Sequence, residues 1–309
     1  MGVLEIQQLY KSFGSHPVLT GLDMDVPEHS IFGFVGQNGA GKTTTMKIVL
    51  GLLRSNGGTV RICGEPACFG ETKTNRNIGY LPDVPEFYNY MRPQEYLKLC
   101  GEITGLSTAH TKLRSEELLS LVGLANEKKR IGGFSRGMKQ RLGIAQALLH
   151  EPKILLCDEP TSALDPIGRK EILDILRTIK GQTTVVFSTH ILSDVERICD
   201  RVAILHHGQI ALSGTLAEVK ERHRHHGFTI VLANAEDLTV LANCDELKLP
   251  AVTLTQAEPY EEHSLTVTIL DRNNSGAFLL EAMARYGIVP LRFEVLEPTL
   301  ENLFTEVVQ

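Results

Sequence analysis

Residues 36–43 read Gly-Gln-Asn-Gly-Ala-Gly-Lys-Thr and fit the pattern G-x-x-x-x-G-K-[ST] of a phosphate-binding loop. An apolar run at 31–35 precedes them and predicts a buried strand, while residues 44–50 predict the start of a helix. In this setting the backbone N–H groups of the loop converge on one point, where the helix N-terminus adds positive potential. We therefore expect a strand–loop–helix phosphate site and not a glycine-rich turn with a surface lysine.

Two side chains of the loop have expected tasks of their own. Lys42 supplies a positive charge for the β- and γ-phosphates of a nucleotide, and the Thr43 hydroxyl supplies a ligand for Mg²⁺. The loop backbone supplies further contacts. The predicted nucleotide-binding residues of this segment are Gly36, Gln37, Asn38, Gly39, Ala40, Gly41, Lys42, Thr43 and Thr44.

The composition is that of a globular protein. Of the 309 residues, 42% are hydrophobic and 22% are charged, so the chain can bury a sizeable core. The net charge of −6 argues against a broad nucleic-acid-binding surface. The sequence has no run of about 18 apolar residues and no signal-peptide pattern at its start. Its cysteines form no paired zinc motif, so free thiols in a reducing cytoplasm are the simplest interpretation.

The order of the expected elements indicates an α/β fold. Residues 3–35 predict several strands, and residues 93–125 have the apolar spacing of helices. Three apolar strands then alternate with helices, at 153–157, 184–188 and 201–205. Such alternation is typical of a parallel sheet covered by helices.

The pattern changes near residues 221–227, where a helix closes in a basic stretch. Beyond it the sequence predicts a small α+β domain with no chemical motif of its own. Its strands are expected at 228–232, 251–255, 265–270 and 289–295, and its helices at 277–286 and 299–307. We therefore expect one domain at 1–222, which carries the phosphate-binding loop, and a second domain at 228–309. His223, His225 and His226 are interpreted as a solvated helix end, with a metal site as the alternative.

Two acids follow the strand expected at 153–157. Asp158 and Glu159 stand at a strand C-terminus, which is where ligands bind in a parallel sheet. We expect Asp158 to hold Mg²⁺, directly or through water, and Glu159 to orient or deprotonate the attacking water in phosphoryl transfer. An Asp-Glu pair without a phosphate-binding loop is more often a solvated strand end.

Taken in order, the motifs of residues 3–220 resemble those of the nucleotide-binding subunit of an ATP-binding-cassette (ABC) transporter. Residues 134–138, Phe-Ser-Arg-Gly-Met, stand where this family has its signature Leu-Ser-Gly-Gly-Gln. The resemblance implies a P-loop NTPase fold with a RecA-like core, an antiparallel β subdomain and a helical subdomain. It also implies ATP and Mg as cofactors and ATP hydrolysis as the activity.

The resemblance assigns further roles. Phe13 matches the aromatic residue that stacks on adenine, and His190 matches the switch histidine, which contacts the γ-phosphate and Glu159. From residue type alone, a core position is the simpler interpretation of His190, and Phe13 could also be core. Residues 162–165, Ser-Ala-Leu-Asp, match the loop at the dimer interface, which makes Asp165 a residue of that interface.

Ser135 is expected to open a helix, so its hydroxyl and the first-turn N–H groups form an anion site. In the family this site meets the γ-phosphate held by the other subunit, which implies roles in trans for Ser135, Arg136 and Gly137. One chain has one phosphate-binding loop and one signature. Two copies, head to tail, would therefore bury two ATP molecules, and we expect ATP to dimerise this protein.

Two motifs depart from the family pattern. The signature has Arg136 for Gly and Met138 for Gln, and Asp83 stands where the family has its Gln lid residue. Asp83 can still coordinate Mg²⁺, and an ordinary loop residue after Pro82 is an equal alternative. Both departures, and the ending at 298–304, resemble the branch of drug, antibiotic and lipid exporters and of some metal-maturation transporters.

The resemblance also implies partners. A polytopic membrane permease, encoded separately, would convert ATP-driven dimerisation into export and hold this subunit at the cytoplasmic face of the membrane. Aromatic residues at 87–90 stand where the family receives the permease, and local core packing is an equal alternative. The alternative function is a soluble ABC ATPase acting on DNA or the ribosome. Such proteins usually carry two cassettes or a long coiled coil, which this sequence lacks, so we expect no nucleic-acid partner.

Overall fold

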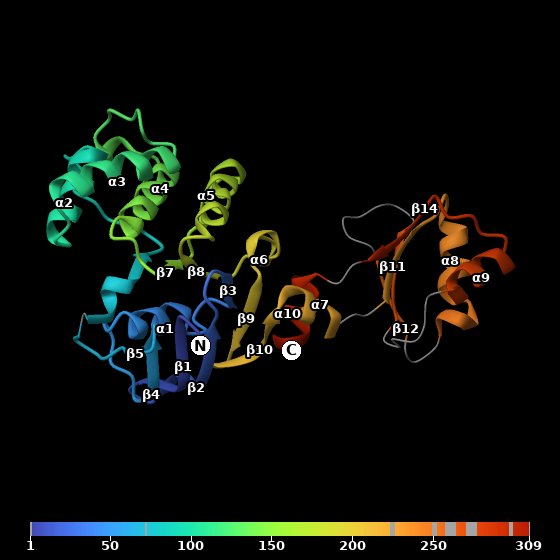
Figure 1. Cartoon of the computed structure of the whole chain (residues 1–309). Coiled ribbons are helices and arrows are strands. Elements are labelled where there is room, and N and C mark those ends of the chain that lie inside the picture. The colour runs from blue at the N-terminus through green and yellow to red at the C-terminus, as the bar shows by residue number, and fades with distance from the viewer. Residues whose placement is uncertain are drawn as a thin grey trace. The chain divides into compact units, whose positions relative to one another are not determined.

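The computed structural model describes residues 2–71, 73–222, 226–248, 252–256, 264–269, 277–296 and 299–308. The chain divides into two compact units (Figure 1). The first comprises Met1–Leu216 with Val307–Gln309, and the second comprises Ala217–Glu306. The expected domain bounds, 1–222 and 228–309, stay a prediction. Among the described residues, no helix has both the length and the apolar composition to cross a bilayer.

The first unit contains an antiparallel sheet in the order β2-β1-β4-β5. β1 pairs with β2 from Leu4, opposite Val26, to Phe13, opposite His16, and β4 pairs with the other edge of β1. Leu4 and Ile6 are buried and lie two residues apart, on the same side of the strand, so one face of the sheet belongs to the core. The strands are β1 (Leu4–Phe13), β2 (His16–Val26), β4 (Gly57–Ile62) and β5 (Glu65–Pro66).

A six-stranded sheet in the order β10-β9-β3-β8-β7-β6 forms the centre of this unit. All of its strand pairs are parallel except β9 with β10. Every residue of β3, β7 and β8 is buried, as is typical of parallel strands covered on both faces. Because β3 and β7 both flank β8, three carboxyl ends meet at one edge. The strands are β3 (Ile31–Gly36), β6 (Ile78–Leu81), β7 (Ile154–Asp158), β8 (Thr184–Thr189), β9 (Arg201–His206) and β10 (Gln209–Thr215).

Helix α1 (Lys42–Val49) follows the loop after β3, as the phosphate-loop motif predicts. It ends at Val49, and Gly51 then turns the chain with a φ of 70°. A Cβ at this position would lie 2.8 Å from the backbone oxygen of Cys68, so only glycine fits.

Three helices between β6 and β7 form a group of their own, in which α2 packs on α3 and α3 on α4 (Figure 1). The helical pattern of residues 93–125 is confirmed as two helices. Gly105, with a φ of 77°, follows the first, and the Ser107 hydroxyl begins the second by accepting a hydrogen bond from the His110 N–H at 3.3 Å. The helices are α2 (Pro93–Ile103), α3 (Thr108–Leu121), α4 (Arg136–Leu148), α5 (Pro166–Ile179), α6 (Leu192–Ile198) and α7 (Leu216–Arg222), with 3-10 turns at Lys73–Asn77 and Ile131–Gly133.

The second unit has an antiparallel sheet in the order β12-β13-β11-β14, with α8 and α9 on one face (Figure 1). The chain order β-α-β-β-α-β gives it a ferredoxin-like topology. Ile230 of β11 packs in one core with Leu241 of α8 and Met283 of α9. The α+β class expected here is confirmed, whereas α8 was not expected. The elements are β11 (His226–Val231), α8 (Ala235–Asn243), a 3-10 turn (Asp245–Leu247), β12 (Val252–Gln256), β13 (Ser264–Ile269), α9 (Ala277–Arg285), β14 (Arg292–Leu296) and, as far as Glu306, α10 (Leu300–Val308).

Candidate functional site

The phosphate-binding loop connects β3 to α1 at the edge where the strand ends meet. Gly39 and Gly41 have φ values of 82° and 113°, which other residues rarely adopt. A Cβ at Gly41 would also lie 2.8 Å from the Leu19 side chain. The N–H of Ala40 closes a turn by donating to the Gln37 carbonyl at 3.1 Å. The loop therefore has a backbone shape that depends on glycine at these positions.

Lys42 is almost fully buried at the base of this loop. Its ammonium donates to the backbone oxygens of Gly36, at 2.6 Å, and Gln37, at 3.2 Å. It also lies 3.3 Å from Oε1 of Glu159. That oxygen has no aligned hydrogen bond, so attraction between opposite charges holds this contact. The lysine thus joins the loop to the acid that follows β7.

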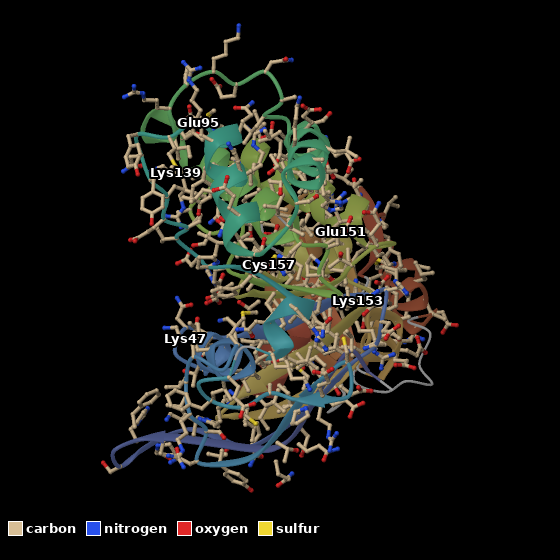
Figure 2. The ribbon with its side chains drawn as sticks, turned by 60° about the vertical axis from the view of Figure 1, so that its left-hand side comes forward. Lys47, Glu95, Lys139, Glu151, Lys153 and Cys157 are labelled. Carbon is tan, nitrogen blue, oxygen red and sulfur yellow. The ribbon has the colours of Figure 1, made fainter. Side chains whose placement is uncertain are left out.

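Asp158 connects the loop to the neighbouring strand through both oxygens of its carboxylate. Oδ2 accepts a hydrogen bond from the Thr43 hydroxyl at 2.7 Å, and Oδ1 accepts one from the Ser188 hydroxyl at 2.6 Å. Asp158 lies opposite Ser188 in the parallel pair of β7 and β8. Cys157, which precedes it, lies in the interior of the unit (Figure 2). The carboxylate is therefore fixed in orientation on both sides.

Glu159 begins the turn after β7 with a φ of 49°, a left-handed conformation. Its N–H donates to the Ser188 carbonyl at 3.0 Å. Its Oε2 lies 2.9 Å from Nδ1 of His190. His190 is 45% exposed, so its interpretation as a core residue is wrong, and the expected contact with Glu159 is present. The roles of both residues in catalysis stay predictions.

The phosphate-binding loop, the two acids after β7 and His190 line one pocket of about 370 Å³. The pocket combines loop backbone, one lysine and three carboxylates, which suits a phosphate-bearing ligand together with a hard cation. Thr43 and Asp158 supply the oxygen ligands that Mg²⁺ prefers, and Asp83 offers a third oxygen donor at the same pocket. The lining residues are Asn38, Gly39, Gly41, Lys42, Thr43, Thr44, Asp83, Asp158, Glu159, Ser162 and His190.

Other predicted residues lie outside this lining. Phe13 is half exposed at the end of β1, with the Lys11 ammonium 4.8 Å from its ring centre. Ser135 caps α4, and its hydroxyl accepts a hydrogen bond from the Met138 N–H at 3.2 Å. Asp165 caps α5 in the same way. Their roles toward adenine and a second subunit stay predictions, as does that of Gly137.

Asp83 belongs to residues 82–92, between β6 and α2, which we call the lid loop. Its carboxylate accepts a hydrogen bond from the Arg136 guanidinium at 3.0 Å, and its backbone oxygen accepts one from the Gln140 side chain at 2.6 Å. Burial raises the pKa of the Asp83 carboxyl, Arg136 opposes that rise, and the nearby carboxylates of Asp158 and Glu159 add to it. The lid loop is therefore attached to α4.

Sequence reasoning missed several of these contacts. Ser188 was not recognised as a site residue, although a hydroxyl near the end of the apolar strand β8 is an available signal. Ser162 was recognised only as part of the interface loop, yet it lines the pocket. In the lid loop, Tyr88 and Tyr90 are exposed, whereas Phe87 packs edge-on against Tyr96.

Some residues named in the sequence predictions lie outside the part of the chain that the structure describes. His223 and His225, and Pro298 of the C-terminal motif, lie outside the described residues. Within the described part of the chain, no group of three or more His, Cys, Asp or Glu side chains is arranged to hold a metal ion on its own.

Comparisons with known proteins agree with this geometry. A family model described as "ABC transporter" matches residues 19–162. The chain is 40% identical over 307 residues to YxlF of Bacillus subtilis, named as an uncharacterized ABC transporter ATP-binding protein, and the match covers 99% of each chain. It is 32% identical over 309 residues to the bacitracin transport ATP-binding protein BcrA of Enterococcus faecalis, covering 99% of this chain and 96% of the relative.

A solved structure extends the comparison to three dimensions. The structure described as the ATP binding subunit of an ABC transporter matches with a TM-score of 0.65 and 32% identity, over 71% of this chain and 92% of that chain. The predicted P-loop NTPase fold class is thereby confirmed. The chain belongs to the ABC transporter family, as one of its ATP-binding and ATP-hydrolysing subunits.

Proposed function

We propose that this chain powers an exporter: two copies close on two Mg·ATP, hydrolysis reopens them, and a separate membrane permease converts the motion into transport. The observation that carries the proposal is the joining of Lys42, Glu159 and His190 in the phosphate pocket. Export is supported by the bacitracin transport protein among the relatives. The permease would hold the subunit at the cytoplasmic face of the membrane.

The phosphate-binding loop would hold the nucleotide. Its N–H groups and the Lys42 ammonium would contact the β- and γ-phosphates, and Phe13 would stack on the base. Thr43 and Asp158 would hold Mg²⁺, with Asp83 as a further candidate ligand. Bound there, Mg²⁺ would neutralise charge that develops on the phosphate oxygens.

Hydrolysis would use the two groups at the strand ends of β7 and β8. A water attacks the γ-phosphorus, its bond to the bridging oxygen breaks, and ADP and inorganic phosphate leave. Glu159 Oε2 lies 2.9 Å from His190, so the histidine holds the carboxylate that orients this water and accepts its proton.

A second copy of the chain is part of the proposal because the site of one chain is incomplete. Ser135 and Gly137 lie outside the pocket lining, yet α4 begins there with first-turn N–H groups able to bind an anion. In a head-to-tail dimer, the Ser135 hydroxyl and the backbone N–H groups of Arg136 and Gly137 would face the γ-phosphate held by the other copy. Asp165 would lie at the same interface.

The membrane partner would meet the lid loop. Tyr88 and Tyr90 are 54% and 65% exposed and lie beside α2, as suits a surface that contacts another protein. The second domain, 228–309, would support the dimer or regulate it. If deletion of that domain leaves ATPase, transport and the dimer unchanged, neither role is tenable.

The test is a pull-down of tagged Glu159→Gln protein from detergent-solubilised native cells with ATP present. Recovery of a multi-span membrane protein, absent with Lys42→Ala, would support the proposal. Recovery of self-dimer, ribosome or DNA-associated proteins alone, from well-extracted membranes, would overturn it. That result would favour a soluble ABC ATPase.

A further inference from the structure

The two sites where this chain departs from its family's pattern contact each other. Asp83 replaces the family's lid glutamine, and Arg136 replaces a signature glycine. They lie 53 residues apart in the chain, and their side chains meet at 3.0 Å. The effect of each departure on the site therefore has to be considered together with that of the other.

Helix α4 holds the lid loop at a second point. Gln140 lies one helical turn after Arg136, so both side chains stand on the same face of α4. Gln140 is completely buried, and its amide donates to the backbone oxygen of Asp83 at 2.6 Å. The helix thus fixes the backbone of Asp83 through Gln140 and its carboxylate through Arg136.

The surrounding charges explain why each residue needs the other. Asp83 shares the pocket with the carboxylates of Asp158 and Glu159, which repel it, and with the half-exposed His190. Arg136 is the first residue of α4, where the helix dipole disfavours a cation. With glycine at 136, Asp83 would lose its counter-charge, and with glutamine at 83, Arg136 would lose the acid that compensates the dipole.

We propose that Arg136 is a positioning residue, whose contact with Asp83 holds the lid-loop carboxylate at the nucleotide pocket and so sets the rate of the hydrolytic step. This inference rests on the proposed function of the pocket. Arg136 acts here through Asp83 of its own chain. A direct contact between its side chain and nucleotide across a dimer is the competing explanation.

The pair is suited to a test by substitution because it adds little to the stability of the fold. The side chains of Arg136 and Asp83 are 40% and 46% exposed, and exposed ion pairs contribute weakly to folding. Gln140 keeps the loop backbone attached when the ion pair is lost. Variants at both positions should therefore fold, with unchanged thermal midpoints.

The experiment is a double-mutant cycle in ATPase kinetics with the full chain, comparing wild type, Arg136→Met, Asp83→Asn and the double variant. In the wild-type background, Arg136→Met should lower kcat about tenfold, with KM for ATP within about twofold. In the Asp83→Asn background, the same change should have less than about a twofold effect. Arg136→Lys, which keeps the charge, should recover most of the rate.

Lys139→Met is the matched control. It removes a positive charge from the same helix (Figure 2), and Lys139 makes no ion pair with any residue that the structure describes. Its kcat should match that of wild type. An equal loss from this control would show that the net charge of α4, and not the contact with Asp83, sets the rate.

Two results would overturn the inference. If Arg136→Met lowers kcat by the same factor in both backgrounds, Arg136 acts independently of Asp83. If KM rises while kcat is kept, Arg136 binds nucleotide. A wild type without ATPase activity would instead refute the proposed function of the pocket.

Hydrogen exchange tests the contact without using activity. Amide exchange across the lid loop, residues 82–92, should speed up in Arg136→Met and show no further increase when Asp83→Asn is added. If exchange is unchanged in Arg136→Met, the contact does not position the loop, whatever the kinetics.

Discussion

The phosphate-binding loop and the lid loop border the same pocket, yet they are held in different ways. The first takes its shape from the backbone, with glycines at left-handed φ values and the buried Lys42 bonded to loop carbonyls. The second is held to α4 by Arg136 and Gln140. A backbone-built loop tolerates few sequences, so a short motif identifies it. A loop held by side chains can exchange both partners together, so no short motif is expected to identify it.

The strongest test of the phosphate-binding loop is Lys42→Ala. We expect kcat/KM for ATP to fall about 1,000-fold or more, because the loop loses the charge that meets the phosphates. Steady-state ATPase assays measure the loss of turnover, and ATP titration calorimetry measures the loss of ATP binding. Lys47→Ala, an exposed lysine of the same helix, serves as the control and should behave as wild type (Figure 2). Equal losses in both variants would remove Lys42 from the site.

Glu159→Gln tests the acid that follows β7 and contacts both Lys42 and His190 in the pocket. We expect kcat to fall about 100- to 1,000-fold while ATP still binds and dimerises the chain, because an amide cannot accept a proton from water. Light scattering with ATP reports the dimer, and a phosphate-release assay reports kcat. Glu151→Gln is the control, since Glu151 is exposed and lies outside the pocket lining (Figure 2). Hydrolysis at the wild-type rate in Glu159→Gln would end its assignment as the base.

Ser188→Ala tests a residue of β8 that belongs to neither loop but orients Asp158 in the pocket they share. Losing the 2.6 Å bond to Asp158 should raise the Mg²⁺ concentration for half-maximal ATPase activity about tenfold, since groups that orient a metal ligand have effects of this size. A magnesium titration of ATPase activity measures the shift, with Ser120→Ala, on the exposed surface of α3, as control. An unchanged titration would mean that Thr43 alone orients the Asp158 carboxylate.

The smallest expected effect is that of Phe13→Ala. If Phe13 stacks on the base, ATP affinity should fall about five- to tenfold, whereas affinity for tripolyphosphate, which has no base, should stay the same. Competition against a fluorescent nucleotide measures both. If the affinities for ATP and for tripolyphosphate fall equally, Phe13 acts on the phosphate-binding loop and does not stack on the base.

Much of the fold could be predicted because its strands are short, apolar and buried on both faces. The strands β3, β7, β8 and β9 appear in the structure within about a residue of their expected bounds. Helix α8 was missed because Leu241 is its only fully buried residue, so its nine positions carry little periodic signal. Strand β10 was missed for a similar reason, since most of its residues are partly exposed.

The candidate site shows the same limit at the level of side chains. The presence of four residues in one pocket was predictable, because each belongs to the loop motif or stands at the end of a strand. They are Lys42, Thr43, Asp158 and Glu159. The contact between Asp83 and Arg136 was not predictable, since two helices separate them in the chain and only tertiary packing brings them together. Each was predicted to depart from its family's pattern, but their mutual compensation is visible only in the fold.

The contacts of Glu159 would impose an order on the events of the proposed reaction cycle. One oxygen lies 3.3 Å from the Lys42 ammonium and the other 2.9 Å from Nδ1 of His190. A phosphate entering the loop would compete for the Lys42 ammonium and thereby weaken its hold on Oε1. Water would then be activated only after nucleotide has arrived, which makes ATP the trigger of its own hydrolysis as well as its substrate.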